Sequence, residues 1–587
     1  MNNIYFISII CILFILCINY NSIIKSDNVI VIGSGLAGLS AALTILESGG
    51  NVILIEKASN LGGNSSKASS GINAVLTDHQ KQKKIVDSIE LFFKDTMKSS
   101  CHNEDPYKTL VTQLVNKSES AVTWLEKRGV NLNQVAILGG HSNPRTHRPD
   151  TNILVGIEII SKLIKHLDKY PNQLQILKNT TVIQLLKKNN IVNGVLYEQN
   201  NNRKKLFSKA IILATGGYGN DHSKMSLLHK YRPDLKDFPT TNSPSTTGDG
   251  VKMGMLIGAL TLDLNEIQVH PTAFIDLKDP NNKTKTLCGE VMRGVGGILL
   301  NESGTRFCNE LGTRQYVVDK MKEQDTNRFI ILLNQLSADQ VTSHLNHYIS
   351  NNLFYKVQNL KELAAKLSIP IKSLESTFNT YNKSAKNKKD TFGKTVFPVE
   401  FSKNDVFYFG YVTPVLHYCM GGLQINEKCE VLTETGIIQN LYAAGEVTSG
   451  IHGCNRLGGN SLLECNVYGR IAGNEVLKKI SVSAVSSRIN QIIGKLPALP
   501  KLNLTKSEIK ISIEELKKHN KENDAWMAID GIVYDVTTYI NKHPGGKDAI
   551  IRHAGKDVTE LFYQIHEKYM LDDIKSNIVG NLIMENK

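Results

Sequence analysis

The stretch that decides the fold is NVIVIGSGLAGLSAALTILESGGNVILIEK, residues 28–57. An apolar run at 28–32 leads into Gly33, Gly35 and Gly38 in the spacing GxGxxG, then into a helical pattern and a second apolar run. In a strand–turn–helix unit, such glycines permit a tight turn, close approach of a pyrophosphate and close packing of the helix. Glu56 ends the second run, where a carboxylate can accept a hydrogen bond from a ribose hydroxyl. The stretch therefore predicts a Rossmann-like α/β domain that binds a dinucleotide.

Two later segments continue this domain. KAIILATGGYGND at 209–221 and NLYAAGEV at 440–447 are predicted as its third and fourth strands. Helical patterns such as LKELAAKLS lie between them and indicate an inserted α+β capping domain. A stretch rich in Ser, Lys and Asn then precedes a compact α+β unit at the C-terminus. The predicted order is a nucleotide domain at 27–265, the capping domain at 266–399, the rest of the nucleotide domain at 400–482, a flexible linker at 483–506 and the C-terminal domain at 507–584.

Composition narrows the functional classes. The chain has 587 residues, 41% of them hydrophobic and 21% charged, which is typical of a folded protein of several domains. The formal net charge is +13, but the lysines are scattered, so we expect a solvated surface and no nucleic-acid partner. Nine cysteines form neither CxxC nor CxxCH, which argues against a zinc ribbon, a dithiol redox centre and covalently attached haem.

The N-terminus has the character of a targeting segment. An apolar run of about 15 residues, from Ile4 to Ile18, is shorter than the ~20 residues that span a bilayer and matches the core of a signal peptide. Residues 1–26 are therefore predicted to be a signal peptide, with an uncleaved signal anchor as the alternative and membrane attachment only in that case. The expected compartment is the secretory pathway, at the endoplasmic reticulum, and the mitochondrion is the alternative.

Three further Gly-rich stretches follow the first: GGNSSKASSGINA at 62–74, ATGGYGN at 214–220 and AAGEVTSGIHGCNRLGGNSLLE at 443–464. Over roughly residues 27–480 they resemble, in order, the flavin-contacting segments of the succinate dehydrogenase/fumarate reductase flavoproteins. The resemblance implies that the dinucleotide is FAD. The residues it places around FAD are Gly33, Gly35, Ala37, Gly38, Glu56, Lys57, Asn64, Ser65, Gly71, Asp249, Glu446, Ser461 and Leu462. Membrane-bound members attach the flavin to a histidine where this chain has Ser65, so non-covalent FAD is expected.

The same resemblance implies a site for fumarate and its product succinate. Two carboxylates need cationic or hydrogen-bonding groups at both ends of the substrate. The matching motifs are EIQVHPT, CGEVMRGVGGILLNESGTRFCNELGTR, TPVLHYCMGG and GCNRLGGN. They assign substrate binding to His270, His417, Arg456 and the position of Gly289, and catalysis to Arg314, Glu290 and Arg293. A family threonine that helps to bind substrate is replaced here by Gly289, and an aspartate that follows the active arginine is replaced by Gln315.

The proton donor is the point on which chemistry and resemblance differ. Hydride from reduced flavin would reach one alkene carbon, and a proton would reach the other. From the ordinary pKa of each side chain alone, a histidine is the expected donor, because guanidinium holds its proton above pH 12. The resemblance instead implies Arg314 as donor, with Glu290 and Arg293 as the relay that returns its proton. We adopt the second assignment as the prediction.

The C-terminal segment carries a second set of motifs: WMAIDGIVYDVT, HPGG and AGKDVT, within residues 507–584. Together they resemble a cytochrome b5 domain. The resemblance implies haem b held between His543 and His566, 23 residues apart on separate helical segments, with His553 as a competing candidate. A haem beside a flavin would be the point at which electrons enter from a donor, either reduced flavin, an NADH-linked reductase or a b5 reductase.

Two other functions remain open from the sequence. A related flavin enzyme could act on urocanate, a 3-ketosteroid or an aspartate-like acid, although the two arginines and two histidines favour a dicarboxylate. A flavohaem carrier could pass electrons to a partner without turning over a small acid. The prediction is an FAD-dependent oxidoreductase acting on CH–CH bonds, namely a fumarate reductase.

Overall fold

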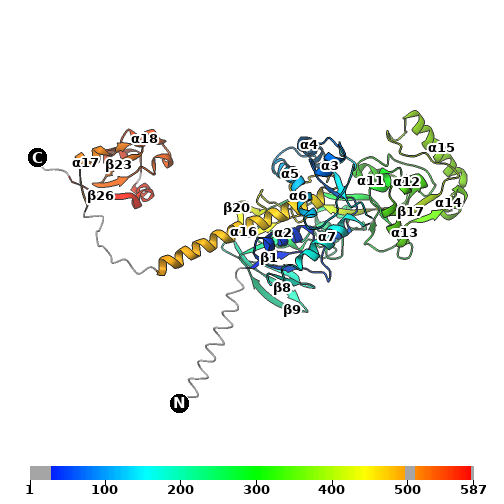
Figure 1. Cartoon of the computed structure of the whole chain (residues 1–587), viewed down its shortest axis with the longest axis horizontal. Coiled ribbons are helices and arrows are strands. Elements are labelled where there is room, and N and C mark those ends of the chain that lie inside the picture. The colour runs from blue at the N-terminus through cyan, green and yellow to red at the C-terminus, as the bar shows by residue number, and fades with distance from the viewer. Residues whose placement is uncertain (1–27, 152, 496–508, 567, 584–587) are drawn as a thin grey trace, which may run out of the picture. The chain divides into compact units, whose positions relative to one another are not determined.

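The computed structural model describes residues 28–151, 153–495, 509–566 and 568–583. Contacts divide the chain into two compact units, residues 1–484 and 485–587 (Figure 1). The predicted leader at 1–26 lies outside the described residues, as does the part of the predicted linker from 496 to 506. None of the helices in the described ranges is long and apolar enough to span a membrane.

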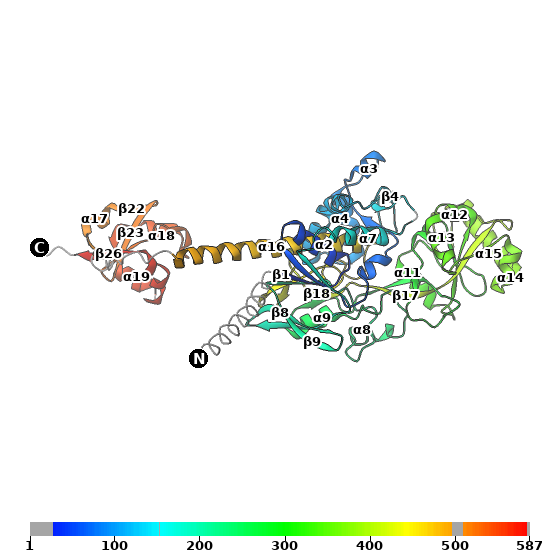
Figure 2. The same ribbon diagram turned by 60° about the horizontal axis from the view of Figure 1, so that its bottom comes forward.

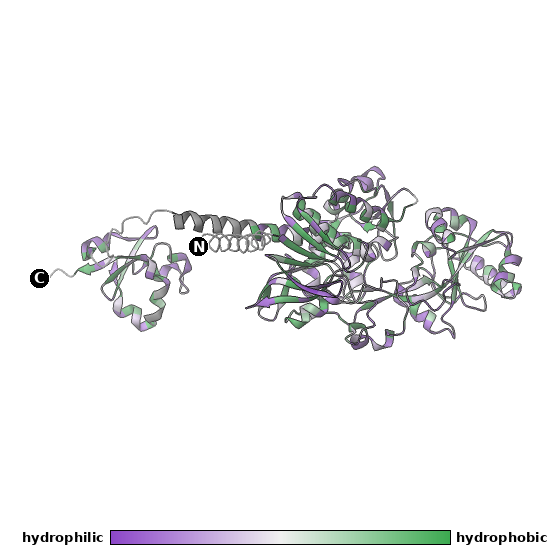
Figure 3. Ribbon diagram, turned by 90° about the horizontal axis from the view of Figure 1, so that it is seen from below, coloured by the Kyte–Doolittle hydropathy of each residue, from purple (hydrophilic) through white to green (hydrophobic). Residues whose placement is uncertain are grey.

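The nucleotide domain is built on a nine-stranded sheet with the order β6-β2-β1-β10-β20-β8-β7 and with β9 and β19 at its side. Its four central strands pair in parallel and include all four predicted ones: β1 (Asn28–Ile32), β2 (Asn51–Ile55), β10 (Ala210–Leu213) and β20 (Gly436–Ala443). They are mostly buried, and their strongly hydrophobic colour in Figure 3 is typical of parallel strands covered on both faces. The predicted Rossmann-like α/β fold is confirmed.

Helix α2 (Leu36–Glu47) follows β1 directly and is buried from Leu36 to Leu46. Its close approach to the sheet depends on Gly38, because a Cβ there would lie 1.9 Å from the carbonyl oxygen of Gly33. Helix α16 (Asn460–Lys495) packs nearby through Gly469, where a Cβ would lie 2.4 Å from the carbonyl oxygen of Ala37. The glycine loop is therefore held between β1 and two tightly packed helices.

The capping domain contains a six-stranded sheet of order β13-β12-β17-β15-β14, with β16 paired to β17. The two long strands of this sheet are β12 (Ile267–Phe274) and β17 (Phe407–Cys419), which pair antiparallel. Helices α12 (Gln335–Asp339), α13 (Thr342–Ser350), α14 (Leu360–Leu367) and α15 (Ile371–Asn387) gather around it in Figure 2. Because β17 belongs to this sheet, the expected return to the nucleotide domain at residue 400 is too early by about one strand.

The predicted linker also differs from the structure. Helix α16 runs from Asn460 to Lys495 and so continues without a break through the first half of residues 483–506. A stretch rich in Ser, Lys and Asn reads as a linker by composition, but only proline and glycine strongly oppose a helix, and this half has no proline. The boundary between the two compact units falls inside the helix, after residue 484.

The C-terminal unit is small, with strands of order β21-β26-β24-β23-β22. Its central hairpin joins β23 (Asp524–Ile529) to β24 (Ile532–Asp535), as the alternating pattern of WMAIDGIVYDVT predicts. The short helices of this unit include η5 (Ile540–Lys542), α18 (Lys547–Ile551) and α19 (Thr559–Ile565). This is the mixed α+β unit that was expected.

Candidate active site

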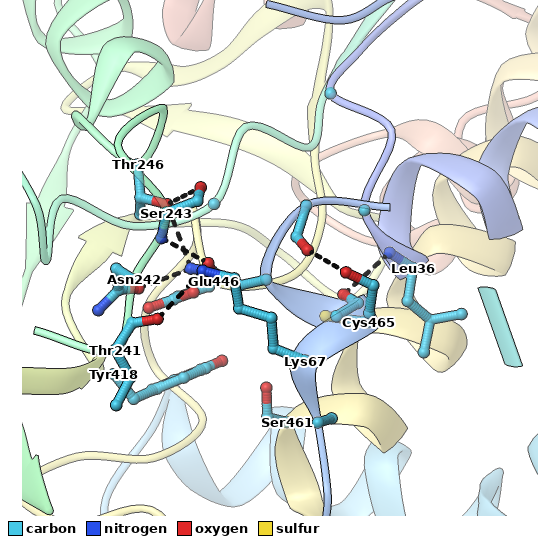
Figure 4. Close-up of a pocket in the computed structure, with 18 of the residues that line it drawn as sticks. Leu36, Lys67, Thr241, Asn242, Ser243, Thr246, Tyr418, Glu446, Ser461 and Cys465 are labelled. Carbon is cyan, nitrogen blue, oxygen red and sulfur yellow. Dashed lines mark hydrogen bonds between the residues drawn. The ribbon is translucent and has the colours of Figure 1, made fainter. Parts of the chain in front are cut away.

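A cavity of about 510 Å³ lies between the nucleotide domain and the capping domain. Its size is in the range of small-molecule and cofactor sites. One end is lined by the Gly-rich loops and the other by side chains of the capping domain, so a cofactor and a substrate would share it. Figure 4 shows part of this lining, including Lys67, Thr241, Asn242 and Glu446.

Glycine is required where the backbone closes on the cavity. Gly33 has φ +100°, and a Cβ there would lie 2.2 Å from the carbonyl oxygen of Ala214. Gly71 has φ +137°, and a Cβ there would meet Thr146 at 2.5 Å. A side chain at either position would push the glycine loop away from the sheet. The amide of Leu36, at the start of α2, points to Ser65 Oγ at 3.1 Å (Figure 4), so a helix N-terminus faces the same space.

The polar groups of the predicted FAD site are held by one another. Both Oγ and the amide of Ser34 donate to Glu56 Oε2, at 2.6 and 2.9 Å, which holds this carboxylate beside the glycine loop. Lys57 Nζ forms an ion pair with Asp249 at 2.9 Å. Asn64 Nδ2 donates to Asn242 at 2.6 Å. These contacts hold the polar side chains that line the cavity in fixed positions before a ligand binds.

The structure brings almost the whole predicted FAD set to the cavity. The predicted residues that line it are Gly33, Gly35, Ala37, Glu56, Lys57, Asn64, Ser65, Gly71, Asp249, Glu446, Ser461 and Leu462. Gly38 is the exception, because it packs behind the loop against Gly33. Burial raises the pKa of Glu446 to about 7, although its Oε1 accepts a hydrogen bond from the Cys419 amide.

At the end of the cavity formed by the capping domain, Arg314 and Arg456 both donate hydrogen bonds to the side-chain amide of Gln268. Gln268, on β12, accepts hydrogen bonds through Oε1 from Arg314 Nη1 at 2.5 Å and from Arg456 Nη2 at 3.2 Å. Gln268 Nε2 donates in turn to Asn455 and to the Arg456 carbonyl, which fixes the amide orientation. Arg456 Nε is buried and has no partner among the described residues, so it is free to bind an anion. The arrangement is a site for a carboxylate-bearing ligand.

His270 and His417 lie beside these arginines, with their ring centroids 5.4 Å apart. Burial, together with the neighbouring positive charges, holds the pKa of both histidines well below the ordinary value. They are therefore neutral near pH 7 and act as hydrogen-bonding groups. Because the protonated form of either histidine is scarcely populated near pH 7, neither holds an imidazolium proton to donate, which supports Arg314 over a histidine as proton donor.

Arg314 lies at the N-terminus of α11 (Arg314–Lys322) and is paired with Glu290. Arg314 Nη2 lies 2.8 Å from Glu290 Oε2, and its Nε donates to the same oxygen at 2.9 Å. Burial would raise the pKa of Glu290, but the Arg314 and Arg293 guanidinium groups outweigh it and lower the pKa to about 2. Glu290 is therefore ionised and keeps Arg314 in place.

The relay beyond Glu290 is only partly visible. Arg293 is buried, and its Nη1 donates to the Glu310 carbonyl. Its Nε and Nη2 have no partner in the described part of the chain, so no hydrogen bond joins it to Glu290 there. Arg293 and Glu290 are absent from the cavity lining of the described chain, so neither is placed to contact a ligand there.

Gly289 is also absent from the lining formed by the described residues, although a substrate role was predicted for this position. Its amide donates to the hydroxyl of Tyr348 at 3.1 Å. Without a side chain, residue 289 presents only backbone, whereas Tyr348 does line the cavity.

Some residues of the site could not be predicted from the sequence. Gln268 lies two positions before His270, but an isolated glutamine predicts nothing until the strand pairing places it between two arginines. Tyr418 lines the cavity and lies 4.5 Å below the Arg456 guanidinium, as a cation–π contact. A disulfide joins Cys101 to Cys454, two residues before Arg456. Partners 353 residues apart without a short motif give no sequence signal for a disulfide.

In the C-terminal unit, the two predicted haem ligands face each other. The rings of His543 and His566 have centroids 5.8 Å apart, and each residue ends a short helix. His543 Nδ1 lies 3.4 Å from the Gly546 carbonyl, which favours a proton on Nδ1 and leaves Nε2 free to bind a metal. Imidazole nitrogen binds transition metals at about 2 Å, so the gap suits one ion between the rings. His566 also stacks on Phe562.

The fold and the two sites define a flavoprotein oxidoreductase with an appended haem domain. The "FAD binding domain" family matches residues 28–462, and the "Cytochrome b5-like Heme/Steroid binding domain" family matches residues 512–583. The chain belongs to the FAD-binding family of succinate dehydrogenase and fumarate reductase flavoproteins, carries a C-terminal cytochrome b5-like domain and has FAD and haem as its cofactors.

Named relatives cover nearly all of the nucleotide and capping domains. "Fumarate reductase" from Schizosaccharomyces pombe is 42% identical over 79% of this chain and 92% of its own length. "Fumarate reductase 1" from Saccharomyces cerevisiae is 39% identical over 76% of this chain and 98% of its own length. Among solved structures, the open conformation of a flavocytochrome c3 fumarate reductase is 34% identical with a TM-score of 0.66, over 78% of this chain and 79% of that chain.

Proposed function

We propose that this protein is a fumarate reductase that reduces the alkene of fumarate to give succinate. The observation that carries the proposal is that Arg314 and Arg456, which both donate to Gln268, line the same cavity as the glycine loops. The names of the two yeast relatives, both called fumarate reductases, support it. A 3-ketosteroid, which carries no carboxylate, would leave these buried cations without a partner.

Different residues of the chain would bind the substrate and stabilise its charge. Arg456, held by Gln268 and Tyr418, would bind a substrate carboxylate through its unpartnered Nε. His417 Nδ1 lies 2.8 Å from Thr241 Oγ1, and in the tautomer in which this nitrogen accepts, the ring carries its proton on Nε2 and can donate to the substrate. His270 Nδ1 instead donates to the Thr272 carbonyl at 2.9 Å, so Nε2 of its neutral ring carries no proton. These neutral and charged donors would stabilise negative charge that develops on the substrate.

FAD, when bound, supplies the hydride for one alkene carbon. Arg314 donates a proton to the other carbon, so that two electrons and two hydrogen nuclei convert fumarate into succinate. A neutral arginine is unfavourable, and the ionised Glu290 at 2.8 Å draws a replacement proton towards it. Arg293 contributes positive charge behind Glu290, and in this proposal it is the next member of the relay.

FAD is held without a covalent bond in this proposal, because Ser65 stands at the position of the flavin-linked histidine. Ser65 Oγ instead accepts a hydrogen bond from the start of α2. The haem is of b type, held by His543 and His566, and is the entry point for single electrons. The donor of those electrons would be reduced flavin, an NADH-linked reductase or a b5 reductase.

The secretory pathway, at the endoplasmic reticulum, is the proposed location, with the mitochondrion as the alternative. The disulfide between Cys101 and Cys454 supports an oxidising compartment. Membrane attachment would depend on an uncleaved segment at residues 1–26.

The test is steady-state turnover by the purified flavin-loaded protein with reduced viologen dye. Fumarate, urocanate, a 3-ketosteroid and acrylate are compared at equal concentration, and succinate is measured directly. We expect kcat/KM for fumarate to exceed each of the others by a factor of about 100 or more, as expected when an unmatched substrate leaves buried charges unpaired. A larger value for any other compound would reassign the substrate, and no turnover with any of them would favour an electron carrier.

A further inference from the structure

Two hydroxyl groups in the cavity take no part in the steps above. They belong to Ser69, in the loop after η2 (Gly63–Lys67), and to Tyr348, on α13 of the capping domain. Both residues are buried, with 6% and 1% of their surface exposed. The two hydroxyls therefore come from opposite sides of the boundary between the two domains.

Both hydroxyls have unused hydrogen-bonding capacity. Ser69 Oγ is buried and has no partner within the described residues. The Tyr348 oxygen accepts from the Gly289 amide at 3.1 Å, and its own proton has no acceptor in the described part of the chain. Burial raises the pKa of Tyr348, so this phenol keeps its proton. Buried donors without acceptors are costly, which points to a ligand that accepts from them.

The two groups converge on one place. A Cβ built on Gly289 would lie 3.4 Å from Ser69 Oγ and 3.4 Å from the Tyr348 oxygen. The side chain missing at residue 289 thus leaves a gap flanked by two hydroxyls. The next residue is Glu290, which holds Arg314 at 2.8 Å, so the gap lies beside the arginine that acts on the substrate.

We propose that the hydroxyls of Ser69 and Tyr348 together bind one carboxylate of the dicarboxylate substrate and so help to set its affinity. The inference rests on the proposed function, which supplies the dicarboxylate. A carboxylate held by both hydroxyls would also join the flavin loop to α13, where the carbonyl of Ser69 already meets His344 Nε2 at 3.3 Å. Substrate binding would then hold the capping domain against the nucleotide domain.

The test uses Ser69→Ala and Tyr348→Phe in the full-length, cofactor-loaded protein. Losing a hydrogen bond to a charged group weakens binding by about tenfold or more, so KM for fumarate should rise by that factor in each variant while kcat changes little. The dissociation constant of succinate, from the shift in flavin absorbance, should rise in parallel. Tyr381→Phe is the matched control, because Tyr381 is equally buried in the capping domain and lies outside the cavity lining of the described residues.

Rescue separates a binding role from a structural one. Gly289→Ser in the Ser69→Ala background places a new hydroxyl in the gap at ordinary contact distance, and it should recover part of the lost affinity. Unchanged KM and succinate affinity in both single variants would overturn the inference, as would a loss confined to kcat. Failure of the wild-type protein to reduce fumarate would contradict the proposed function instead, and the succinate titration would still decide the role of the hydroxyls.

Discussion

At the residue scale, the proposed catalysis rests on a buried charge arrangement around Arg314. Three contacts to two oxygen atoms fix this guanidinium: two to Glu290 Oε2 and one to Gln268 Oε1. Four titratable neighbours are locked in one state near pH 7, since Glu290 is ionised, both histidines are neutral, and Arg456 stays charged even though burial lowers its pKa to about 10. These fixed charge states leave Arg314 as the proposed proton donor of this cluster.

The first prediction follows from that arrangement. Arg314→Ala should lower kcat for fumarate by about a thousandfold or more, the range for loss of a general acid. FAD should stay bound, because the glycine loops are untouched. The control is Arg328→Ala, whose guanidinium is exposed and paired with Glu302 at the surface of the same domain, and whose kcat should match the wild type. A drop of only a few-fold in the folded Arg314→Ala protein would rule out the proton-donor role.

The second prediction concerns pH and Glu446. Its folded pKa, about 7, lies above the ordinary value of about 4.3, so the folded state keeps a proton that the unfolded state releases. The stability due to this proton is present below about pH 4 and is lost as pH rises through 7. Glu446→Gln cannot ionise, so the variant should gain stability relative to the wild type between pH 5 and pH 8. Urea unfolding of protein stripped of FAD measures this gain, and a constant difference across that range would contradict it.

Sequence predicts residues of this site well where a motif contains them and poorly where tertiary contact creates them. The glycines, Glu56, Arg314 and Arg456 lie in short motifs whose chemistry is readable. Gln268 and Tyr348 gain their place in the site only through the fold, because β12 brings Gln268 against the two arginines and α13 brings Tyr348 to the cavity. The neutrality of His270 and His417 was likewise not predictable, because burial depends on the whole fold.

At the element scale, the loop that carries Arg456 is tied to the end of α4 (Ile89–Ser100). The Cys454 amide donates to the Ser100 carbonyl at 3.0 Å, and Cys454 is joined to Cys101 by the disulfide. Asn455, next along the loop, binds Ser99 Oγ and Gln268. The position of Arg456 therefore depends on an element more than 350 residues away in sequence.

The third prediction is that Cys101→Ser weakens both the fold and the site. Loss of a native disulfide typically costs about 2–5 kcal/mol, so the thermal unfolding midpoint of the flavoprotein unit should fall. KM for fumarate should rise as the Arg456 loop loosens. A reductant should reproduce both changes in the wild type and cause none in the variant. Equal midpoints and equal KM values with and without reductant would show that the disulfide has no such role.

Elements were predicted best where their pattern is local. The four parallel strands of the nucleotide domain and the hairpin of the C-terminal unit are apolar runs of the expected length, and all are present. The end of the capping domain was misplaced, because β17 is a buried strand whose sheet membership depends on pairing with β12 and β15. The start of the linker was misplaced too, because a polar composition does not end a helix such as α16.

At the scale of the whole molecule, the two compact units have different proposed roles: the C-terminal unit receives electrons and the first unit reduces the substrate. Reduction of an alkene by hydride takes two electrons, whereas a haem iron carries one. The haem of the C-terminal unit would therefore have to be reduced twice in each turnover. The chain joins the units covalently, which keeps the local concentration of haem domain high whatever the donor.

The fourth prediction tests that division. A chain that ends at Lys501, and separately His543→Ala, should keep fumarate reduction driven by viologen dye, because the cavity lies wholly in the first unit. Both should lose most of the activity driven by a donor that reduces haem. His553→Ala is the control, since His553 is the competing ligand candidate and it is the His566 ring that lies beside His543. Equal loss with both donors would mean that the C-terminal unit supports folding instead of electron entry.

The most direct test of the central claim is a rapid-mixing experiment on the full-length protein. The protein is reduced anaerobically until flavin and haem are both reduced, and is then mixed with fumarate while both absorbance bands are followed. We predict that the flavin reoxidises on mixing, that the haem follows, and that one succinate appears for each two electrons lost. Flavin and haem that stay reduced in the presence of fumarate would contradict the account.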